Sequence, residues 1–151
     1  MNHETLSLVD LTATACALAG VALPPDAALD SHNLLPSFLG QTHGRPVRAV
    51  MVMGTRGIEH LILREGPWKL IFPTSGARPQ LYQLDEDPAE TTDLAAANPE
   101  KTAALRAALM HYVESGASRP GAQGRPGSLD ALFQERDHRN RMLEARFGTG
   151  R

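Results

Sequence analysis

The sequence predicts an α+β fold in which a four-stranded antiparallel sheet is packed by one helix. Four short strand-like runs follow one another between residues 47 and 84. Short links that contain glycine join the first three, which is typical of antiparallel hairpins. A helical pattern begins after them at Asn98 and offers an apolar stripe that would cover the sheet. At 151 residues, the chain is long enough to bury one core but too short for a large two-domain enzyme.

An apolar helix is predicted before the sheet. Ser7 is its expected cap, with Asp10 as the capping-box partner three residues on. The helix is expected to end at Gly20, because Pro24 and Pro25 prevent its continuation. One side of this helix would carry Leu11, Ala15, Leu18 and Ala19.

The same stretch has features of a secretory signal, because it is apolar and lies near Met1. A signal requires a positive segment before its apolar core, whereas the charged side chains here are Glu4 and Asp10. The charge pattern therefore favours a helix over a signal peptide. No run approaches the roughly 20 apolar residues of a transmembrane helix, and the sequence leaves the localisation open.

The pattern along residues 31–84 predicts one helical turn and then the strands. The turn is expected over 33–39, ending at Gly40. The strands are expected at Val47–Met53, Ile58–Arg64, Trp68–Phe72 and Gln80–Leu84. Links at 54–57 and 65–67 make the first three strands consecutive hairpins.

Alternation along the strands predicts which face is covered. Trp68, Leu70 and Phe72 share one face of the third strand, and Leu61 and Leu63 share one face of the second. The covering helix is expected to begin after the cap Asn98, with Pro99 in first position, and to end before Gly116. Its stripe would consist of Leu105, Leu109 and either Tyr112 or Val113. If Trp68 is buried in this core, its replacement by alanine should cost about 3–5 kcal/mol.

The last part of the chain differs in composition from the sheet region. Residues 117–127 are rich in Gly, Pro, Ser and Ala and are typical of a linker. A final helix is expected from Ser128 to Phe147. Its middle is almost wholly polar, so we interpret it as an arm that lies over a neighbour.

Charge is uneven along the chain, although the formal net charge is only −2. Residues 85–101 hold six acids and one base, while residues 119–151 hold seven arginines and four acids. We interpret both as solvated surfaces, since neither is a dense block of one sign. The slightly acidic chain disfavours binding to nucleic acid or to an anionic membrane. A single cysteine excludes a disulfide within the chain.

The search for catalytic and metal-binding patterns gives no site. Asp30, His32 and Asn33 lie close together and could place oxygen and nitrogen on one ion. A site usually takes three or four convergent ligands, so a role at a helix start, accepting backbone N–H groups, is favoured. Cys16 has no adjacent base and is interpreted as a small buried hydrophobic residue. The sequence therefore predicts neither a catalytic residue nor a metal site.

Arg64 and Lys69 are the candidates for binding an anion, since cations on strands could pair with one at the edge of the sheet. The alternative is that both are strand-end charges whose stems reach into water. His60 shares a face with Ile58 and Ile62 and is interpreted as a core or edge histidine rather than a general base.

Four phrases resemble, in the same order, motifs of the sulfatase family. V-D-L-T-A-T at 9–14, with L-A-G-V at 18–21, is similar to V-D-L-x-P-T…L-A-G-V. D-S-H-N-L-L-P at 30–36 is similar to D-G-x-S-L-L-P, and R-E-G-P-W-K-L-I at 64–71 to R-x-G-x-W-K-L-I. L-Y-Q-L-D-E-D-P-A-E at 81–90, with D-L-A at 93–95, is similar to L-Y-D-L-x-x-D-P-x-E-x-x-N-L-A. The departures are Ala13 for proline, Ser31 and His32 for glycine, and Asp93 for asparagine.

The resemblance covers about residues 5–113 and implies the carboxy-terminal portion of a sulfatase. Residues 1–25 would be the last helix of the large α/β domain, which is alkaline-phosphatase-like. Residues 26–116 would be the carboxy-terminal subdomain, followed by the linker at 117–127 and an arginine-rich helical arm at 128–151.

The resemblance also implies sulfate-ester hydrolysis by the full-length family. There, the nucleophile is a formylglycine made from the first residue of Cys/Ser-x-Pro-x-Arg, beside calcium or another divalent cation. Cys16 is followed by neither the proline nor the arginine, and no Ser-x-Pro-x-Arg occurs in the chain. We therefore expect this chain to be inert alone and to bind no cofactor. Arg64 and Lys69 would be peripheral contacts to an anionic substrate.

Two hypotheses of function follow. In the first, the chain is a fragment of a sulfatase whose partner is the missing amino-terminal domain, or which self-associates through the apolar side of its first helix. In the second, it is a stand-alone, non-enzymatic interaction module in which that helix folds back on its own sheet. The sequence leaves open the substrate, the oligomeric state, whether the chain is a truncation, and export of the full-length protein.

Overall fold

A computed structural model of the protein describes residues 5–55 and 59–147, the side chains of Glu144 and Phe147 excepted. Its internal contacts form two compact units. The first unit consists of residues up to Met51 together with Ser115–Pro126, and the second of Val52–Glu114 together with the chain from Gly127 onward. Each unit is described below by itself. The four-part division expected from the sequence stays a prediction.

The first unit contains two helices, α1 (Asp10–Leu18) and α2 (Leu35–Phe38). The prediction that Ser7 caps α1 is wrong: the helix begins at Asp10, and no side chain caps it. One half of the capping box does form, because the Ser7 N–H donates to Asp10 Oδ2 at 2.8 Å. Asp10 also accepts a second backbone N–H, that of His32 in the loop after α1.

The composition predicts residues 117–127 as a linker, and residues 117–126 of this segment belong to the first unit. The Arg119 guanidinium donates to the carbonyl oxygens of Pro24, Ala27 and Ala28, at 2.7, 3.0 and 3.3 Å. Gly116 allows the chain to turn here. It has a φ of +64°, and a Cβ at this position would lie 2.0 Å from the carbonyl oxygen of Arg125.

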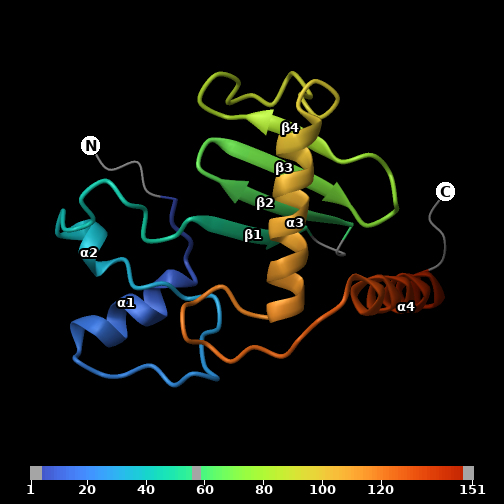
Figure 1. Ribbon diagram of the computed structural model, residues 1–151. Coiled ribbons are helices and arrows are strands. Elements are labelled where there is room, and N and C mark those ends of the chain that lie inside the picture. The colour runs from blue at the N-terminus through green and yellow to red at the C-terminus, as the bar shows by residue number, and fades with distance from the viewer. Residues whose placement is uncertain (1–4, 56–58, 148–151) are drawn as a thin grey trace. The chain divides into compact units, whose positions relative to one another are not determined.

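The second unit is built around the sheet, whose strands are β1 (Val50–Gly54), β2 (His60–Glu65), β3 (Trp68–Pro73) and β4 (Gln80–Gln83). The first two residues of β1 belong to the first unit. The strands lie side by side in the order β1-β2-β3-β4 (Figure 1). β3 pairs antiparallel with both neighbours, so that Leu70 stands opposite Leu63 on β2 and opposite Leu81 on β4. The predicted four-stranded antiparallel sheet is thus confirmed. Ile58 and part of the first predicted link lie outside the described residues.

Helix α3 (Pro99–Ser115) crosses one face of the sheet, as predicted (Figure 1). It buries Leu105, Leu109 and Val113, so the alternative with Tyr112 in the stripe is not the one observed. Five leucines in this layer are essentially inaccessible to solvent: Leu63, Leu70, Leu81, Leu105 and Leu109. Trp68 is half-buried, so the condition attached to its expected loss on replacement by alanine, burial in this core, is met only in part. It is the first residue of β3.

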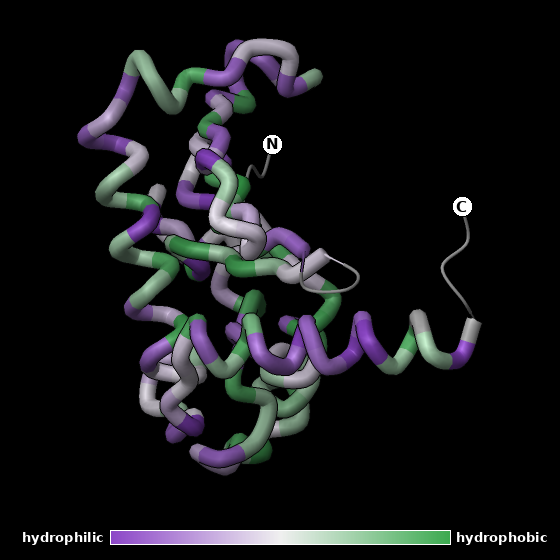
Figure 2. Tube along the Cα trace, turned by 90° about the vertical axis from the view of Figure 1, so that its right-hand side faces the viewer, coloured by the Kyte–Doolittle hydropathy of each residue, from purple (hydrophilic) through white to green (hydrophobic). Residues whose placement is uncertain are grey.

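Helix α4 (Leu129–Phe147) follows in the second unit, close to the predicted bounds. Ser128 caps it by accepting the N–H of Ala131 at 3.1 Å. Hydrophilic residues predominate along much of its length (Figure 2). None of the helices described here is long and apolar enough to cross a membrane.

Candidate functional site

The carboxylate of Asp10 is the centre of a buried polar network in the first unit. Asp10 is fully buried, and Oδ1 accepts both the N–H of His32, at 2.9 Å, and Nη2 of Arg48. Arg48 is itself 4% exposed, and the same Nη2 donates to the carbonyl oxygen of Asp30. A buried charge is tolerable only when it is paired and hydrogen-bonded, and both conditions hold for Asp10.

Two hydroxyl groups add to this network and join α1 to the loop before α2. Thr14 Oγ1 donates to the carbonyl oxygen of Asp10 at 2.7 Å and accepts the N–H of Leu34 at 3.0 Å. Ser31 Oγ accepts the N–H of Ala13 at 2.8 Å. The phrases V-D-L-T-A-T and D-S-H-N-L-L-P therefore bind each other through their polar side chains.

Helix α1 consequently buries its polar side and exposes its apolar side. The residues that it buries are Asp10, Ala13 and Thr14. Leu8 just before the helix is 83% exposed, and Leu11 and Leu18 within it are 56% and 68% exposed. This polarity is the reverse of that of an ordinary surface helix, whose apolar stripe faces the core.

The ionisation of Asp10 follows from its partners. Burial by itself opposes the charged form, but the hydrogen bonds from Arg48 and from the N–H groups of His32 and Ser7 outweigh it. They hold the pKa of Asp10 below its ordinary value. Asp10 is therefore a carboxylate at neutral pH, and the network contains a true ion pair with Arg48.

The metal interpretation of Asp30, His32 and Asn33 finds no support in their contacts. Asp30 Oδ1 accepts the N–H of Ser118 at 3.0 Å, and the His32 ring Nε2 lies 3.2 Å from Ser118 Oγ. Asn33 Oδ1 accepts the N–H of Leu35 at the start of α2, at 3.0 Å. Throughout residues 5–55 and 59–147, no group of three His, Cys, Asp or Glu could hold a metal ion. The donors present thus do not fit the divalent cation that the family implies.

Acidification is expected to destabilise the first unit in two stages. Burial, with the nearby Arg48 charge, lowers the pKa of His32, so the unfolded chain binds that proton more readily. Stability should begin to fall below about pH 6.5 through His32, and again below about pH 4 through Asp10, whose pKa is also lowered. Hydrogen exchange of peptides from residues 10–34 at a series of pH values would measure both stages. A His32→Gln variant should lose the first stage only, and an unchanged first stage in it would contradict this assignment.

The structure places Arg64 and Lys69 directly opposite each other on β2 and β3. They therefore share the face of the sheet that α3 does not cover. Lys69 Nζ donates to both carboxylate oxygens of Glu90, at 2.6 and 2.7 Å, and Arg64 Nε donates to the carbonyl oxygen of Gly66 at 3.2 Å. Each thus has an intramolecular partner, and their contact with an anionic substrate stays a prediction.

Two carboxylates of the acidic segment after β4 shape the chain. Asp87 Oδ1 accepts the Thr91 hydroxyl at 3.0 Å, and its Oδ2 accepts the Thr92 N–H at 2.8 Å. Asp93 Oδ1 accepts two backbone N–H groups, of Leu81 at 3.0 Å and Ala95 at 2.9 Å. The L-Y-Q-L-D-E-D-P-A-E…D-L-A phrase is therefore a set of turn and pairing contacts around β4.

The departure from the family motif at Asp93 should have little effect on stability. Asp93→Asn keeps the Oδ1 acceptor, and we expect it to change the free energy of unfolding by less than about 0.5 kcal/mol. Asp93→Ala removes the acceptor of both N–H groups and should cost about 1–3 kcal/mol. Urea unfolding of the two variants measures the difference. An asparagine variant as unstable as the alanine variant would mean that the charge, rather than the acceptor, matters.

Sequence reasoning did not find Arg48. Its partner Asp10 lies 38 residues away along the chain, and no periodicity or motif links the two. The available signal was Asp10 itself, since an acid on the buried side of a helix requires a cation.

Comparisons with known proteins agree on one family. No family model matches the chain. Arylsulfatase K of Bos taurus is 34% identical over 130 residues, covering 73% of this chain and 22% of that protein. The N-acetylgalactosamine-6-O-sulfatase of Bacteroides thetaiotaomicron is 31% identical over 113 residues, covering 66% of this chain and 22% of that protein. The chain spans about a fifth of the length of the curated relatives it matches.

Solved structures give the same result. A 2-O GAG sulfatase superposes with a TM-score of 0.56 at 26% identity, covering 69% of this chain and 24% of that one. Ps i-CgsB reaches a TM-score of 0.63 over 95% of this chain and 31% of its own, but at 17% identity it shows a likeness of fold alone.

The α+β fold and these matches together define a chain of the sulfatase family, with homologues named as sulfatases over about 70% of its length. The matches are consistent with the carboxy-terminal portion of a sulfatase. The resemblance stated from the four sequence phrases is confirmed.

Proposed function

We propose that this chain is the carboxy-terminal portion of a sulfatase and that it supports sulfate-ester hydrolysis only together with an amino-terminal catalytic domain. The sulfatase homologues support this, because the chain aligns with only about a fifth of their length, as one portion of a longer enzyme would. The subdomain around the sheet would then be the smaller, non-catalytic part of the enzyme.

The single observation that carries the proposal is the exposed apolar side of α1. Leu8, Leu11 and Leu18 face away from the first unit, because the network around Asp10 fixes the opposite side of the helix. A contiguous exposed apolar surface of this kind is typical of a protein–protein contact. We propose that the amino-terminal domain of the sulfatase covers it.

The same proposal includes that the chain by itself does not hydrolyse sulfate esters. Ester hydrolysis needs a nucleophile, an electrophilic group and a proton donor within one site. In the part of the chain that the structure describes, Cys16 is half-buried on α1. The ring of His32, in the network around Asp10, is hydrogen-bonded to the hydroxyl of Ser118. No catalytic step is therefore assigned to these residues.

The test has two parts. The purified chain should not hydrolyse 4-nitrophenyl sulfate in the presence of calcium, and in-frame DNA upstream of the Met1 codon should encode Cys/Ser-x-Pro-x-Arg. Turnover by the chain alone would overturn the inertness. An in-frame stop before any such motif would overturn the fragment and favour the stand-alone interaction module.

Solution behaviour adds an independent test of the α1 surface. We expect the chain to bind a dye specific for apolar surfaces, and a Leu8→Gln/Leu11→Gln/Leu18→Gln variant to bind less. Substitution at the exposed Thr12 is the matched control on the same helix. A monomer without dye binding would instead favour the self-contained module.

A further inference from the structure

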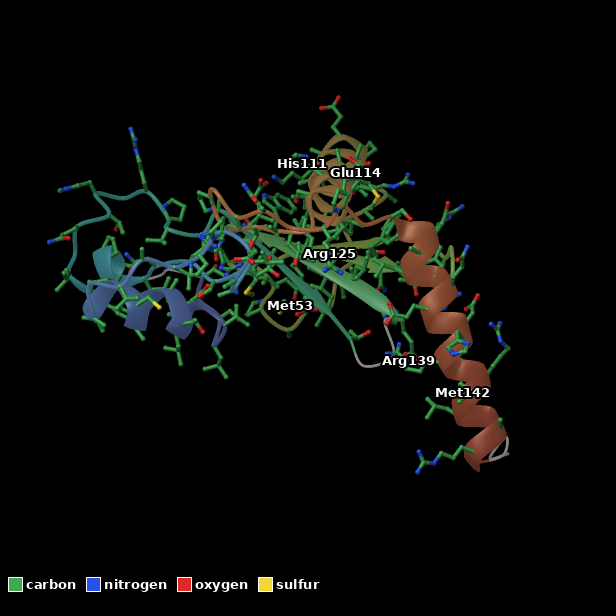
Figure 3. The ribbon with its side chains drawn as sticks, turned by 90° about the horizontal axis from the view of Figure 1, so that it is seen from below. Met53, His111, Glu114, Arg125, Arg139 and Met142 are labelled. Atoms are coloured by element: carbon green, nitrogen blue, oxygen red, sulfur yellow. The ribbon has the colours of Figure 1, made fainter. Side chains whose placement is uncertain are left out.

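The second half of α4 extends past the sheet without covering it. The side of the helix turned to the sheet holds its half-buried residues, Leu129, Leu132, Phe133, Arg136 and Arg139. Arg136 Nη1 anchors this side by donating to the carbonyl and hydroxyl oxygens of Thr74, at 2.7 and 3.0 Å. The C-terminal part of the helix projects away from the sheet in two views (Figures 2 and 3).

This projecting half exposes apolar side chains. Met142 is 60% exposed and Leu143 is 47% exposed. Most helices in proteins are stabilised by packing of one side rather than by helix propensity. A projecting half-helix with two exposed apolar residues therefore indicates a surface that another molecule covers. We call residues 138–147 the arm.

Arg139 lies where the arm begins (Figure 3) and lacks an acceptor. Its Nε and Nη2 are both buried, and neither has a hydrogen-bond partner. These two N–H groups form one edge of the guanidinium, the edge that binds a carboxylate in a bidentate manner. Leaving them unsatisfied is unfavourable, so rotation of this long side chain toward an external carboxylate would be favourable.

The chain itself carries the complementary charge. The arm holds three arginines and one glutamate, whereas residues 85–100 hold six acids and neither Lys nor Arg. Three of those acids are engaged by Thr91, by Lys69 and by the backbone, as described above. Asp85 and Glu86 are exposed, and their carboxylates have no hydrogen bond or ion pair within the described residues.

These carboxylates are out of reach of the arm in the same molecule. The segment that follows β4 lies beyond that edge of the sheet, whereas α4 lies toward the opposite edge, formed by β1 (Figure 1). We propose that the arm binds the Asp85–Glu86 turn of a second copy of this chain. Two-fold symmetry lets both copies make the contact at once. Arg139 then forms an ion pair with a carboxylate of the turn, and the second copy covers Met142 and Leu143 next to it.

Sedimentation velocity at a series of protein concentrations tests the proposal. We expect a dimer at about 0.05 M salt that dissociates toward about 1 M salt, because screening weakens exposed charge pairs. Association through the apolar side of α1 should instead persist at about 1 M salt, since burial of apolar surface is not weakened by screening. The salt response thus separates this proposal from the proposed function, and a monomer under all low-salt conditions overturns it.

Charge reversal tests the particular contact. Arg139→Glu should raise the dimer dissociation constant at least about tenfold. Arg141→Glu makes the same change of charge on the exposed side of the arm and should have a smaller effect. Mixing the Arg139→Glu chain with a Glu86→Arg chain should restore a dimer, because each contact then joins opposite charges. Equal effects of the two arginine variants, or no recovery on mixing, would overturn the contact.

Replacing Arg139 could unfold α4, and far-ultraviolet circular dichroism would detect this. A second variant therefore leaves Arg139 in place. Leu143→Ser leaves the anchor at Arg136 intact and should also weaken the low-salt dimer. If the helix content of this variant is unchanged and its dimer is as stable as that of the parent chain, the arm is not the contact surface.

Discussion

Replacing Arg48 by methionine is expected to destabilise the first unit by about 3–5 kcal/mol. Methionine preserves much of the buried volume but leaves the Asp10 carboxylate, which is fully buried, without its cation. The backbone N–H groups of Ser7 and His32 remain as donors and prevent a still larger loss. Hydrogen exchange of peptides from residues 10–34, read as the free energy of opening, measures the effect.

A double-mutant cycle identifies the cause. Asp10→Asn removes the charge but keeps an acceptor, and it leaves Arg48 without its anion. The double variant should lose less than the sum of the two single losses, because neither charge is then left unpaired. Additive losses would mean that each side chain acts through packing alone, and that the ion pair contributes little.

The elements of the second unit were predictable because their signals are local. Glycines and proline separate the strands, alternation indicates their faces, and Pro99 begins α3 where the helical pattern begins. Ser128 likewise caps α4 at the predicted residue.

The first unit was less predictable, because its determining contacts are distant along the chain. Ser7 and Asp10 have the spacing of a capping box, but the Asp10 carboxylate also binds Arg48 and the His32 N–H, and the helix starts at Asp10. The apolar side of α1 was recognised from periodicity, yet periodicity gives no indication of whether that side is covered. Lys69 was singled out as a cation on a strand, and its partner Glu90 lies 21 residues further on.

Replacing Leu70 by alanine is expected to cost the second unit about 3–5 kcal/mol. Leu70 is inaccessible to solvent and stands between Leu63 and Leu81 in adjacent strands. The strands on both sides limit how far this layer can relax into a cavity, so the loss should lie near the upper end for a leucine. Urea unfolding followed by the fluorescence of the single tryptophan, Trp68, reports on this unit.

Two neighbouring substitutions are the controls for this core assignment. Ile71→Ala lies on the opposite face of the same strand, where the side chain is half-buried, and should cost less than Leu70→Ala. Trp68→Ala, followed by circular dichroism because it removes the fluorophore, should also cost less, since Trp68 keeps contact with solvent. If the tryptophan variant were instead the least stable of the three, the end of β3 rather than the row of leucines would be the centre of the core.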